Sequence, residues 1–132
     1  MNTETSFDEV YNKVSPLSDS AFYTLLCLFA ISNSDLVDEE RGIHPYGVKR
    51  WVRKFSKKVI ELPTATIYTV LNRFVDAGVA YIFRQDEKKS YYEITEVGRQ
   101  VFIKEHSRLK VLGEAAEVVM DGYGVEPTNL PW

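Results

Sequence analysis

The chain has 132 residues, of which 45% are hydrophobic and 27% charged, and its formal net charge is −3. These values are typical of one globular domain with its own core. The longest mostly apolar run, residues 21–31, is shorter than the roughly 20 residues that span a bilayer, and the N-terminus lacks the basic and apolar regions of a signal peptide. A single cysteine excludes an intramolecular disulfide. We therefore expect a cytoplasmic protein without membrane contact.

The first predicted elements are two helices. A short helix is indicated by an apolar stripe: Phe7, Val10, Tyr11 and Val14. Residues 15–18 would end it, and Ser18 is a suitable N-cap for a second helix that runs to about Ser32. Because the second helix is apolar on nearly every side, we expect it to be mostly buried, with one face against a second subunit. Its Cys27 is expected to be a small core residue rather than a reactive thiol.

An acidic segment without periodicity follows at residues 33–42, and it is predicted to be a loop. Four of its side chains are candidate ligands of a divalent cation: Asp35, Asp38, Glu39 and Glu40. Their spacing is not that of a calcium-binding loop, so a solvated loop is the favoured interpretation. We expect neither a metal site nor a cofactor.

A third helix is predicted from Pro45, a favoured first position, to about Lys57. Its expected buried stripe is Val48, Trp51, Val52, Phe55 and Val59. The remaining surface is cationic: Lys49, Arg50, Arg53, Lys54, Lys57 and Lys58. Such a run of charges is commonly a solvated face, but six cations in ten residues without an acid favour contact with phosphates.

Residues 62–78 predict a fourth helix, with Pro63 and Thr64 as start signals and Gly78 as a stop. Its apolar residues share one face: Ile67, Leu71, Phe74 and Val75. The opposite face collects small, polar or cationic side chains: Ala65, Thr66, Thr69, Asn72, Arg73 and Asp76. A face of this kind can lie in a groove and contact polar base edges. We therefore interpret this segment as a recognition helix.

A β-hairpin is predicted next, because residues 79–84 and 90–94 are rich in β-forming residues and flank a charged turn at 85–89. Its aromatic residues are expected to pack across the strands: Tyr81, Phe83, Tyr91 and Tyr92. Arg84, Lys88 and Lys89 are candidates for contact with a phosphate backbone.

Thr95 is the expected N-cap of a last, long helix, with Glu96 in its first turn. Residues spaced alternately four and three apart are typical of a helix that pairs with another: Phe102, His106, Leu109, Gly113, Ala116 and Met120, with Leu112 and Val119 beside them. Gly113 either allows close helix approach or ends the helix early. We interpret His106 as a packed or hydrogen-bonded structural residue. The tail, residues 121–132, is expected to be loosely held, with Trp132 packed locally or free.

Charge is distributed unevenly along the chain. Residues 49–110 hold 14 of the 16 Lys and Arg but only 7 of the 19 Asp and Glu, which gives this segment a net charge of +7 against −10 for the remainder. A basic middle with acidic flanks is compatible with a phosphate-binding module. Chance segregation of surface charge would give the same pattern, so this observation alone does not decide.

The order of the predicted elements is that of a winged helix-turn-helix, a mainly α fold with a small β-hairpin, followed by a C-terminal dimerisation helix. We expect four regions. These are an N-terminal extension with a short helix (1–16), the winged helix-turn-helix (17–94), the dimerisation helix (95–120) and the tail (121–132).

Several segments resemble the PadR family of transcriptional regulators: 17–26 (LSDSAFYTLL), 44–47 (HPYG), 63–68 (PTATIY), 71–74 (LNRF), Gly78 and 91–99 (YYEITEVGR). The resemblance covers about residues 17–112. It implies a homodimer whose last helix packs against the partner's first helix, a pseudo-palindromic operator, and repression relieved by a small aromatic or drug-like effector. The short C-terminal helix is similar to that of the smaller subgroup. The chain departs from the family in its long acidic loop, its acidic net charge, and a Thr-Ala-Thr at 64–66 in place of a common glycine.

The leading hypothesis is a dimeric repressor that binds double-stranded DNA. Base edges or nearby phosphates would be contacted by Thr64, Thr66, Thr69, Asn72 and Arg73, among which Arg and Asn suit bidentate pairing with guanine and adenine. Phosphates would be held by Lys49, Arg50, Arg53, Lys54, Lys88 and Lys89.

Two other function classes are alternatives to a DNA-binding repressor. A winged helix can serve in protein association without specific DNA binding, and the acidic ends and aromatic hairpin motivate that alternative. An enzyme is disfavoured, because Cys27, His44 and His106 fall in separate elements and no metal spacing or phosphate-binding glycine loop is present.

An effector pocket is a separate hypothesis. Its candidate residues lie on the two helices expected to form the dimer floor: Phe22, Tyr23, Phe102, His106 and Leu109. A flat aromatic ligand could lie between them. The alternative, that these residues simply pack the dimer interface, is equally compatible with the sequence.

Overall fold

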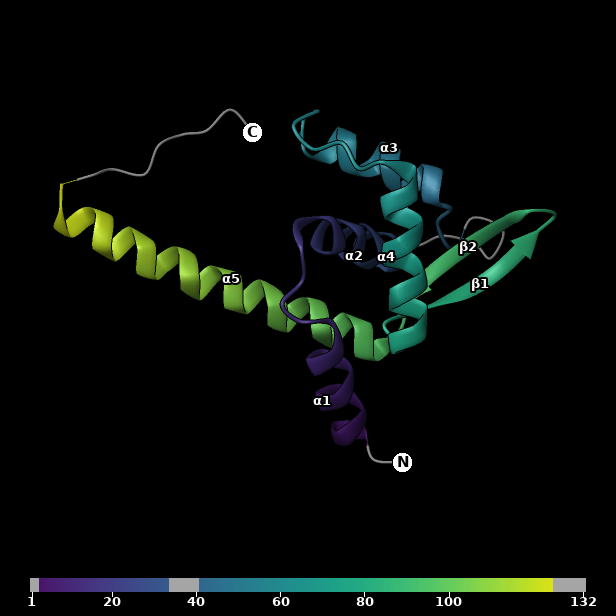
Figure 1. Ribbon diagram of the computed structural model, residues 1–132, viewed down its shortest axis with the longest axis horizontal. Helices are drawn as coiled ribbons and strands as arrows, with labels where there is room; N and C mark the ends of the chain where they lie inside the picture. Colours follow the sequence, from purple (N-terminus) through teal and green to yellow (C-terminus); the bar gives the residue numbers. More distant parts are fainter. Residues whose placement is uncertain (1–2, 34–40, 125–132) are drawn as a thin grey trace.

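The computed structural model describes residues 3–33 and 41–124 and contains five helices and one hairpin (Figure 1). The helices are α1 (Thr3–Val14), α2 (Asp19–Ser32), α3 (Pro45–Phe55), α4 (Thr64–Ala77) and α5 (Glu96–Gly122). The strands are β1 (Ala80–Asp86) and β2 (Lys89–Ile94). This order confirms the predicted fold class, a mainly α winged helix with a small antiparallel hairpin and a long C-terminal helix.

Helix α2 is the centre of the core and contacts α3, α4, α5 and β2. Ser18 caps it as predicted, because its hydroxyl accepts a hydrogen bond from the backbone N–H of Ala21 at 3.2 Å. Cys27 is fully buried, as expected, and burial raises the pKa of its thiol to about 12. The predicted stripe of α1 also reaches this core through Tyr11 and Val14, so α1 packs into the fold.

Helix α3 ends two residues earlier than predicted, and its buried stripe is shorter. Val48 and Val52 are buried, but Phe55 is 59% exposed and Val59 is 47% exposed, so their predicted burial is wrong. The physical reason is a sharp turn after Phe55, in which Lys57 and Lys58 adopt left-handed conformations with φ of 54° and 69°. This turn ends the helix, so Lys57 and Lys58 follow α3 instead of forming its last turn.

Helix α4 matches its prediction closely. Ile67, Leu71 and Phe74 are buried, and Gly78 terminates the helix in the left-handed region with φ of 85°. A glycine is suited to this position because a Cβ would disfavour that conformation. Pro63 occupies the N-cap position, and no side chain caps the helix there. The stiff apolar face therefore fixes which residues of α4 point outward.

The hairpin is longer and its turn tighter than predicted. The aromatic rings were expected to pack across the strands, but Tyr81 lies opposite Glu93, Tyr92 opposite Ile82, and Tyr91 opposite Arg84. A bulge at Phe83 shifts the register, so that Tyr91 lies opposite Arg84 and not opposite Phe83. Ile43, before α3, exchanges two backbone hydrogen bonds of 2.9 Å with Tyr92 and so extends the sheet by one short bridge.

Helix α5 runs two residues beyond its predicted end and continues through Gly113 without interruption. Figure 1 shows it extending well beyond the other helices. A Cβ on Gly113 would meet nothing within 4 Å, so Gly113 is not a helix stop and makes no close approach within this chain. None of the described helices is both long and apolar enough to cross a membrane. Most of the predicted acidic loop and tail, including Trp132, lies outside the described residues.

Candidate nucleic-acid interface

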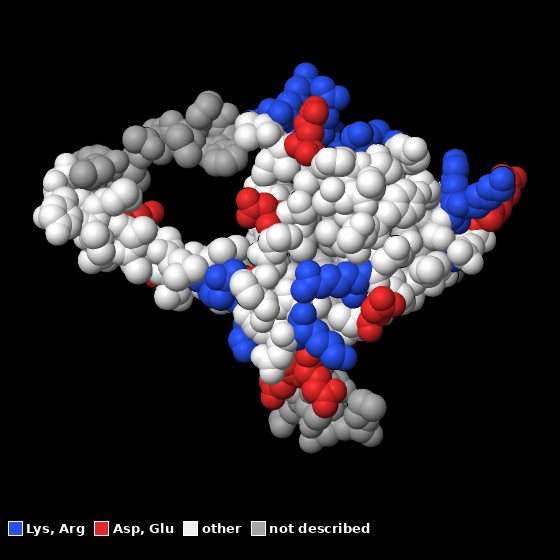
Figure 2. All heavy atoms as spheres, in the orientation of Figure 1, with Lys and Arg blue, Asp and Glu red and all other residues white. Residues whose placement is uncertain are grey.

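The outer face of α4 is polar, accessible and almost uncharged along its first three turns. Ala65, Thr69 and Asn72 are exposed, while Thr64 and Thr66 are partly exposed. Tyr68, which the sequence analysis did not single out, is 39% exposed beside them. Figure 2 shows this uncharged surface between the Lys and Arg side chains that gather over α3 and a mixture of basic and acidic side chains at the tip of the hairpin. The predicted recognition face and the two predicted phosphate-binding groups are therefore neighbours in space.

The cationic residues over α3 form a group of six: Lys49, Arg50, Arg53, Lys54, Lys57 and Lys58. All of them are exposed. Arg53 forms an ion pair with Glu61 at 3.1 Å, which partly neutralises it. Lys88 and Lys89 form a second exposed group at the hairpin tip. Each group can approach an anion without first losing buried contacts.

Two of the predicted base-contacting residues make contacts within the chain. The guanidinium of Arg73 donates to the backbone carbonyl of Lys13 at 3.2 Å, which links the C-terminal half of α4 to the end of α1. The hydroxyl of Thr69 donates to the carbonyl of Ala65 at 3.0 Å. Among the polar residues of this face, Asn72 is exposed and leaves its amide available for an external partner. The amide of Asn72 is therefore accessible, whereas the guanidinium of Arg73 is engaged by Lys13.

Glu93 is a buried carboxylate within the hairpin and was not identified from the sequence. It accepts two hydrogen bonds from Arg41, each of 2.9 Å, and one from the Tyr81 hydroxyl at 2.5 Å. The hydrogen bond to Glu93 is the main cause that raises the pKa of Tyr81. The Arg41 guanidinium also lies 4.5 Å from the centre of the Phe83 ring. These contacts fix the base of the hairpin to the segment that precedes α3.

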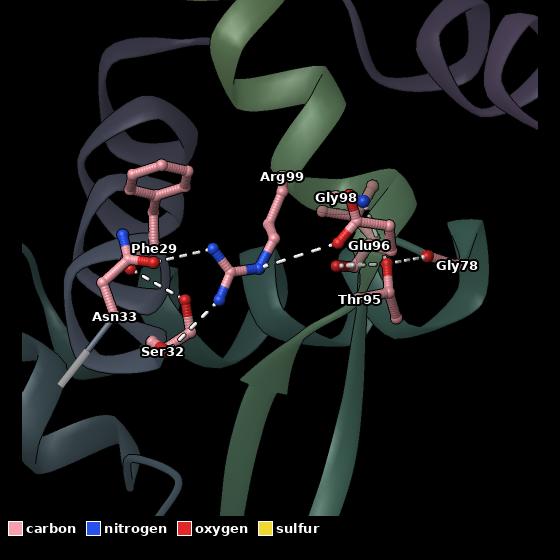
Figure 3. Close-up of polar contacts among 9 residues, drawn as sticks. Phe29, Ser32, Asn33, Gly78, Thr95, Glu96, Gly98 and Arg99 are labelled. Carbon is pink, nitrogen blue, oxygen red and sulfur yellow. Dashed lines mark hydrogen bonds and ion pairs between the residues drawn. The ribbon is translucent and has the colours of Figure 1, made fainter. Parts of the chain in front are cut away.

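The start of α5 contacts the end of α4 directly, through a set of residues that we call the α4–α5 junction: Gly78, Val79, Thr95 and Gly98. Figure 3 shows Gly78, Thr95 and Gly98 of this set. The Thr95 hydroxyl accepts from the Gly98 N–H at 2.9 Å and donates to the Gly78 carbonyl at 2.6 Å. A Cβ on Gly98 would collide with the backbone carbonyl of Val79. The predicted cap at Thr95 is thus confirmed, and its hydroxyl also binds the C-terminal end of α4.

Arg99 connects α5 to the end of α2 (Figure 3). Its guanidinium donates to the Asn33 side-chain oxygen at 2.8 Å and to the Ser32 carbonyl at 3.2 Å, and it lies 5.6 Å from the centre of the Phe29 ring. Helix α2 has no basic residue in its own last turn. Arg99 therefore supplies the cation that the negative end of the helix dipole favours.

Glu105 on α5 is fully buried and is bound by two other segments of the chain and by Arg108 of its own helix. It accepts from the Tyr11 hydroxyl at 2.7 Å, from the backbone N–H of Leu17 at 2.9 Å, and from Arg108 at 2.9 and 3.0 Å. Arg108 is the main cause that lowers the pKa of Glu105 to about 2, against the opposing effect of burial. Sequence pattern offered no signal for this residue, because glutamate on a helix is normally exposed.

The five candidate effector or dimer residues separate into two groups. The Phe102 ring lies 5.4 Å from that of Phe22 and 4.7 Å from that of Phe29, and Tyr23 packs edge-on against Phe22. His106 and Leu109 are exposed farther along α5. The expectation that His106 is packed or hydrogen-bonded is thus not met among the residues that the structure describes.

Known proteins share this fold. A transcriptional regulator from Clostridium thermocellum is 14% identical with a TM-score of 0.59, and the match covers 88% of this chain and 94% of that one. RosR from H. salinarum is 14% identical with a TM-score of 0.55, covering 84% and 97%. The complex described as hsRosR-S4 is 14% identical with a TM-score of 0.56, covering 87% and 96%. Likeness at this level of identity shows the fold alone.

A search of the curated proteins finds no match. The model of the family described as "Transcriptional regulator PadR-like family" matches residues 35–104, more than half of the chain. The matched segment contains α3, α4, the hairpin and the start of α5. The chain therefore belongs to the PadR-like family, and it is a winged-helix transcriptional regulator rather than an enzyme.

Proposed function

We propose that the protein is a homodimeric repressor that places α4 in the major groove of a pseudo-palindromic operator. The observation that carries this proposal is the position of the uncharged, polar face of α4 between two exposed cationic groups. Cations on both sides suit the phosphate backbones that border a groove, while polar side chains between them suit base edges. Membership in a family of transcriptional regulators supports the same function.

Within this proposal the contacts are divided by residue type. Asn72, Thr66 and Thr69 contact bases, and Arg73 acts mainly by holding α4 against α1. Phosphates are bound by the cations of α3 and of the hairpin tip. Arg50 and Lys89 line one cleft. The start of α3 and the hairpin would therefore contact the same phosphate backbone of the DNA.

Dimerisation is proposed through α5. Beyond Arg108 its apolar side chains are exposed, with Leu109 41%, Leu112 54% and Val119 60% accessible. These residues follow the heptad-like spacing of a helix that pairs with another. Light scattering should give the mass of two chains. The double variant Leu112→Lys/Val119→Lys should have the mass of one chain and should lose cooperative operator binding. An unchanged mass would contradict α5 as the interface.

The DNA proposal can be tested by fluorescence anisotropy with DNA upstream of the gene. Binding should weaken steeply with salt, and Lys54→Gln should lower the slope of log K against log salt by about one. Asn72→Ala should weaken specific binding by about 1–3 kcal/mol and relax the preference at one base pair. Lys110→Gln on α5 removes the same charge outside the proposed interface and should change neither quantity. Salt-independent binding would contradict the proposal.

A small aromatic effector is the remaining part of the proposal. The mutual contacts of Phe22, Phe29 and Phe102 fill this place within the single chain and favour packing over an open pocket there. A ligand at this place would therefore have to bind after the dimer forms. Titration of the purified dimer with small aromatic compounds should show binding. The monomeric variant Leu112→Lys/Val119→Lys should lose that binding. Equal binding by that variant would exclude the dimer floor.

A further inference from the structure

A cleft of about 720 Å³ lies between the start of α3 and the hairpin, outside the face of α4. Its lining residues are Gly42, Ile43, His44, Tyr46, Gly47, Arg50, Trp51, Lys54, Lys89 and Tyr91. This volume is within the range of small-molecule sites, about 300–1,000 Å³. The cleft combines aromatic rings with positive charges, and no acidic residue lines it within the described part of the chain.

The backbone that forms the floor of the cleft is closely packed. A Cβ on Gly47 would lie 2.8 Å from Ile43 Cγ1, so glycine at this position lets the first turn of α3 approach the short bridge between Ile43 and Tyr92. Gly42 turns the chain into this bridge with φ of 83°. Close backbone packing on one side and the hairpin on the other give the cleft a shape that does not depend on a ligand.

Aromatic rings face the cleft from two elements. The rings of His44 and Tyr46 are nearly parallel, with centres 5.5 Å apart, and the ring of Tyr91 lies 5.9 Å from that of His44. The far side of Tyr91 carries the Arg84 guanidinium, 3.9 Å from the ring centre. Tyr46 is 55% exposed, so its ring can accept a stacking partner without losing core contacts.

His44 lines this cleft, and a hydrogen bond fixes which of its ring nitrogens is protonated. Its Nδ1 accepts from the backbone N–H of Tyr46 at 3.2 Å as the N-cap of α3, so in the neutral ring the proton is on Nε2. Burial, Lys89 and Arg50 lower the pKa of His44 below its ordinary value of 6.5. The lowered pKa favours the neutral ring, in which Nε2 carries the proton.

The cations of the cleft are not neutralised within the described chain. Arg50, Lys54 and Lys89 are exposed, and none of them forms an ion pair with a residue in the described ranges. Arg50, Lys54 and Lys89 all line this one cleft, so their positive charges repel one another there. An anionic group in the cleft would relieve the repulsion among them.

We propose that this cleft is a binding site for a planar aromatic anion, a ring system that carries one carboxylate or phosphate. The ring stacks on Tyr46 and His44, and the anion accepts hydrogen bonds from Arg50, Lys54 and Lys89. Duplex phosphates would engage the same cations but would leave the aromatic rings without a function. The proposal needs neither DNA nor a dimer, so it can fail or hold independently of the proposed function.

The test is isothermal titration calorimetry with the full chain in the absence of DNA. The probes are 2-naphthoate and 2-naphthyl phosphate, with uncharged 2-naphthamide and inorganic phosphate as comparisons. The proposal predicts saturable binding of at least one naphthyl anion with Kd below about 1 mM, and at least tenfold weaker binding of both comparisons. Whichever naphthyl anion binds more tightly identifies the acidic group. Equal binding of the amide, equal binding of inorganic phosphate, or no saturation by either naphthyl anion would overturn it.

Two matched pairs of variants locate the site. Lys89→Gln and Arg50→Gln remove cations that line the cleft, and each should weaken the naphthyl anion about tenfold. Lys88→Gln and Arg53→Gln remove neighbouring cations that do not line it and should leave the affinity unchanged. In amide NMR spectra of the ¹⁵N-labelled protein, Gly47 and Tyr91 should shift on titration. The assignment would be overturned if Lys88→Gln weakened binding of the naphthyl anion as much as Lys89→Gln, and Arg53→Gln as much as Arg50→Gln. Such equal losses would indicate general electrostatic attraction.

Discussion

The Tyr11 hydroxyl on α1 donates a 2.7 Å hydrogen bond to the carboxylate of Glu105 on α5, 94 positions later in the chain. The same carboxylate accepts from the N–H of Leu17, in the connection between α1 and α2. One buried side chain thus holds the N-terminal segment against the helix that we propose for dimerisation. Because the group is charged and enclosed, its replacement should be costly.

Glu105→Gln should lower the free energy of unfolding by about 2–4 kcal/mol. The neutral amide cannot balance the charge of Arg108, and its N–H groups would face the Tyr11, Leu17 and Arg108 donors that bind the carboxylate. Urea unfolding followed by circular dichroism measures this loss. Tyr11→Phe removes one donor and leaves the carboxylate bound by the others, so it should cost only about 1 kcal/mol. Equal costs for the two variants would contradict a central role for the charge.

Stability should fall in acid within a defined window. The pKa of Glu105 is about 2 in the folded chain against an ordinary value of 4.5, so the unfolded chain takes up the proton first as pH decreases. The contribution is therefore complete above pH 4.5 and is lost as pH falls towards 2. Its size is about 3 kcal/mol, as an upper estimate because Arg108 is partly exposed. The difference between wild type and Glu105→Gln should shrink across this window, and parallel stability curves would contradict the assignment.

Two glycines of α5 should respond to alanine in opposite directions. Gly98→Ala should destabilise the fold by about 3 kcal/mol or more, because its Cβ would collide with the backbone carbonyl of Val79, which cannot move without disturbing β1. Gly113→Ala should stabilise it by about 0.5–1 kcal/mol through helix propensity, because its surroundings are empty. Thermal unfolding of both variants measures the effects. A loss of stability or of dimer mass in Gly113→Ala would instead indicate close approach by a partner helix.

Cys27 should be unreactive in the folded protein. Burial raises the pKa of its thiol to about 12, and its side chain on α2 is fully buried in the core. Native protein treated with iodoacetamide at pH 8 should remain unmodified by mass spectrometry while protein in guanidinium is alkylated completely. Rapid native alkylation would show that α2 opens on that timescale.

The sequence predicted those features that depend on residues close together in the chain. The Ser18 and Thr95 caps, the Gly78 stop and the buried stripe of α4 each follow from spacing within one or two turns. Hydrophobic periodicity and capping chemistry act locally, so a single sequence contains them. The same reasoning led to the winged-helix order and to α4 as the candidate recognition helix.

The features that were missed depend on distant residues or on exceptions to local preference. Lys57 and Lys58 adopt left-handed conformations that lysine rarely takes, so the end of α3 was placed too late. The bulge at Phe83 changes the cross-strand partners of the aromatic residues. Arg99 meets Asn33 across 66 positions of the chain. Of the candidate site, the residue types were predictable, but the turn of Arg73 towards α1 was not.

The α4–α5 junction has a geometric consequence for operator choice in the proposed dimer. Since Gly98 lies against the Val79 carbonyl and Thr95 binds the end of α4, the axis of α5 has a fixed direction relative to the axis of α4. Two chains joined through α5 would then hold their two α4 helices at one separation and one rotation about the DNA axis. The spacing between half-sites would be encoded at residues 95–98, far from any base contact. An operator with one base pair added at its centre would be rejected by the geometry of this corner, with every DNA-contacting side chain intact.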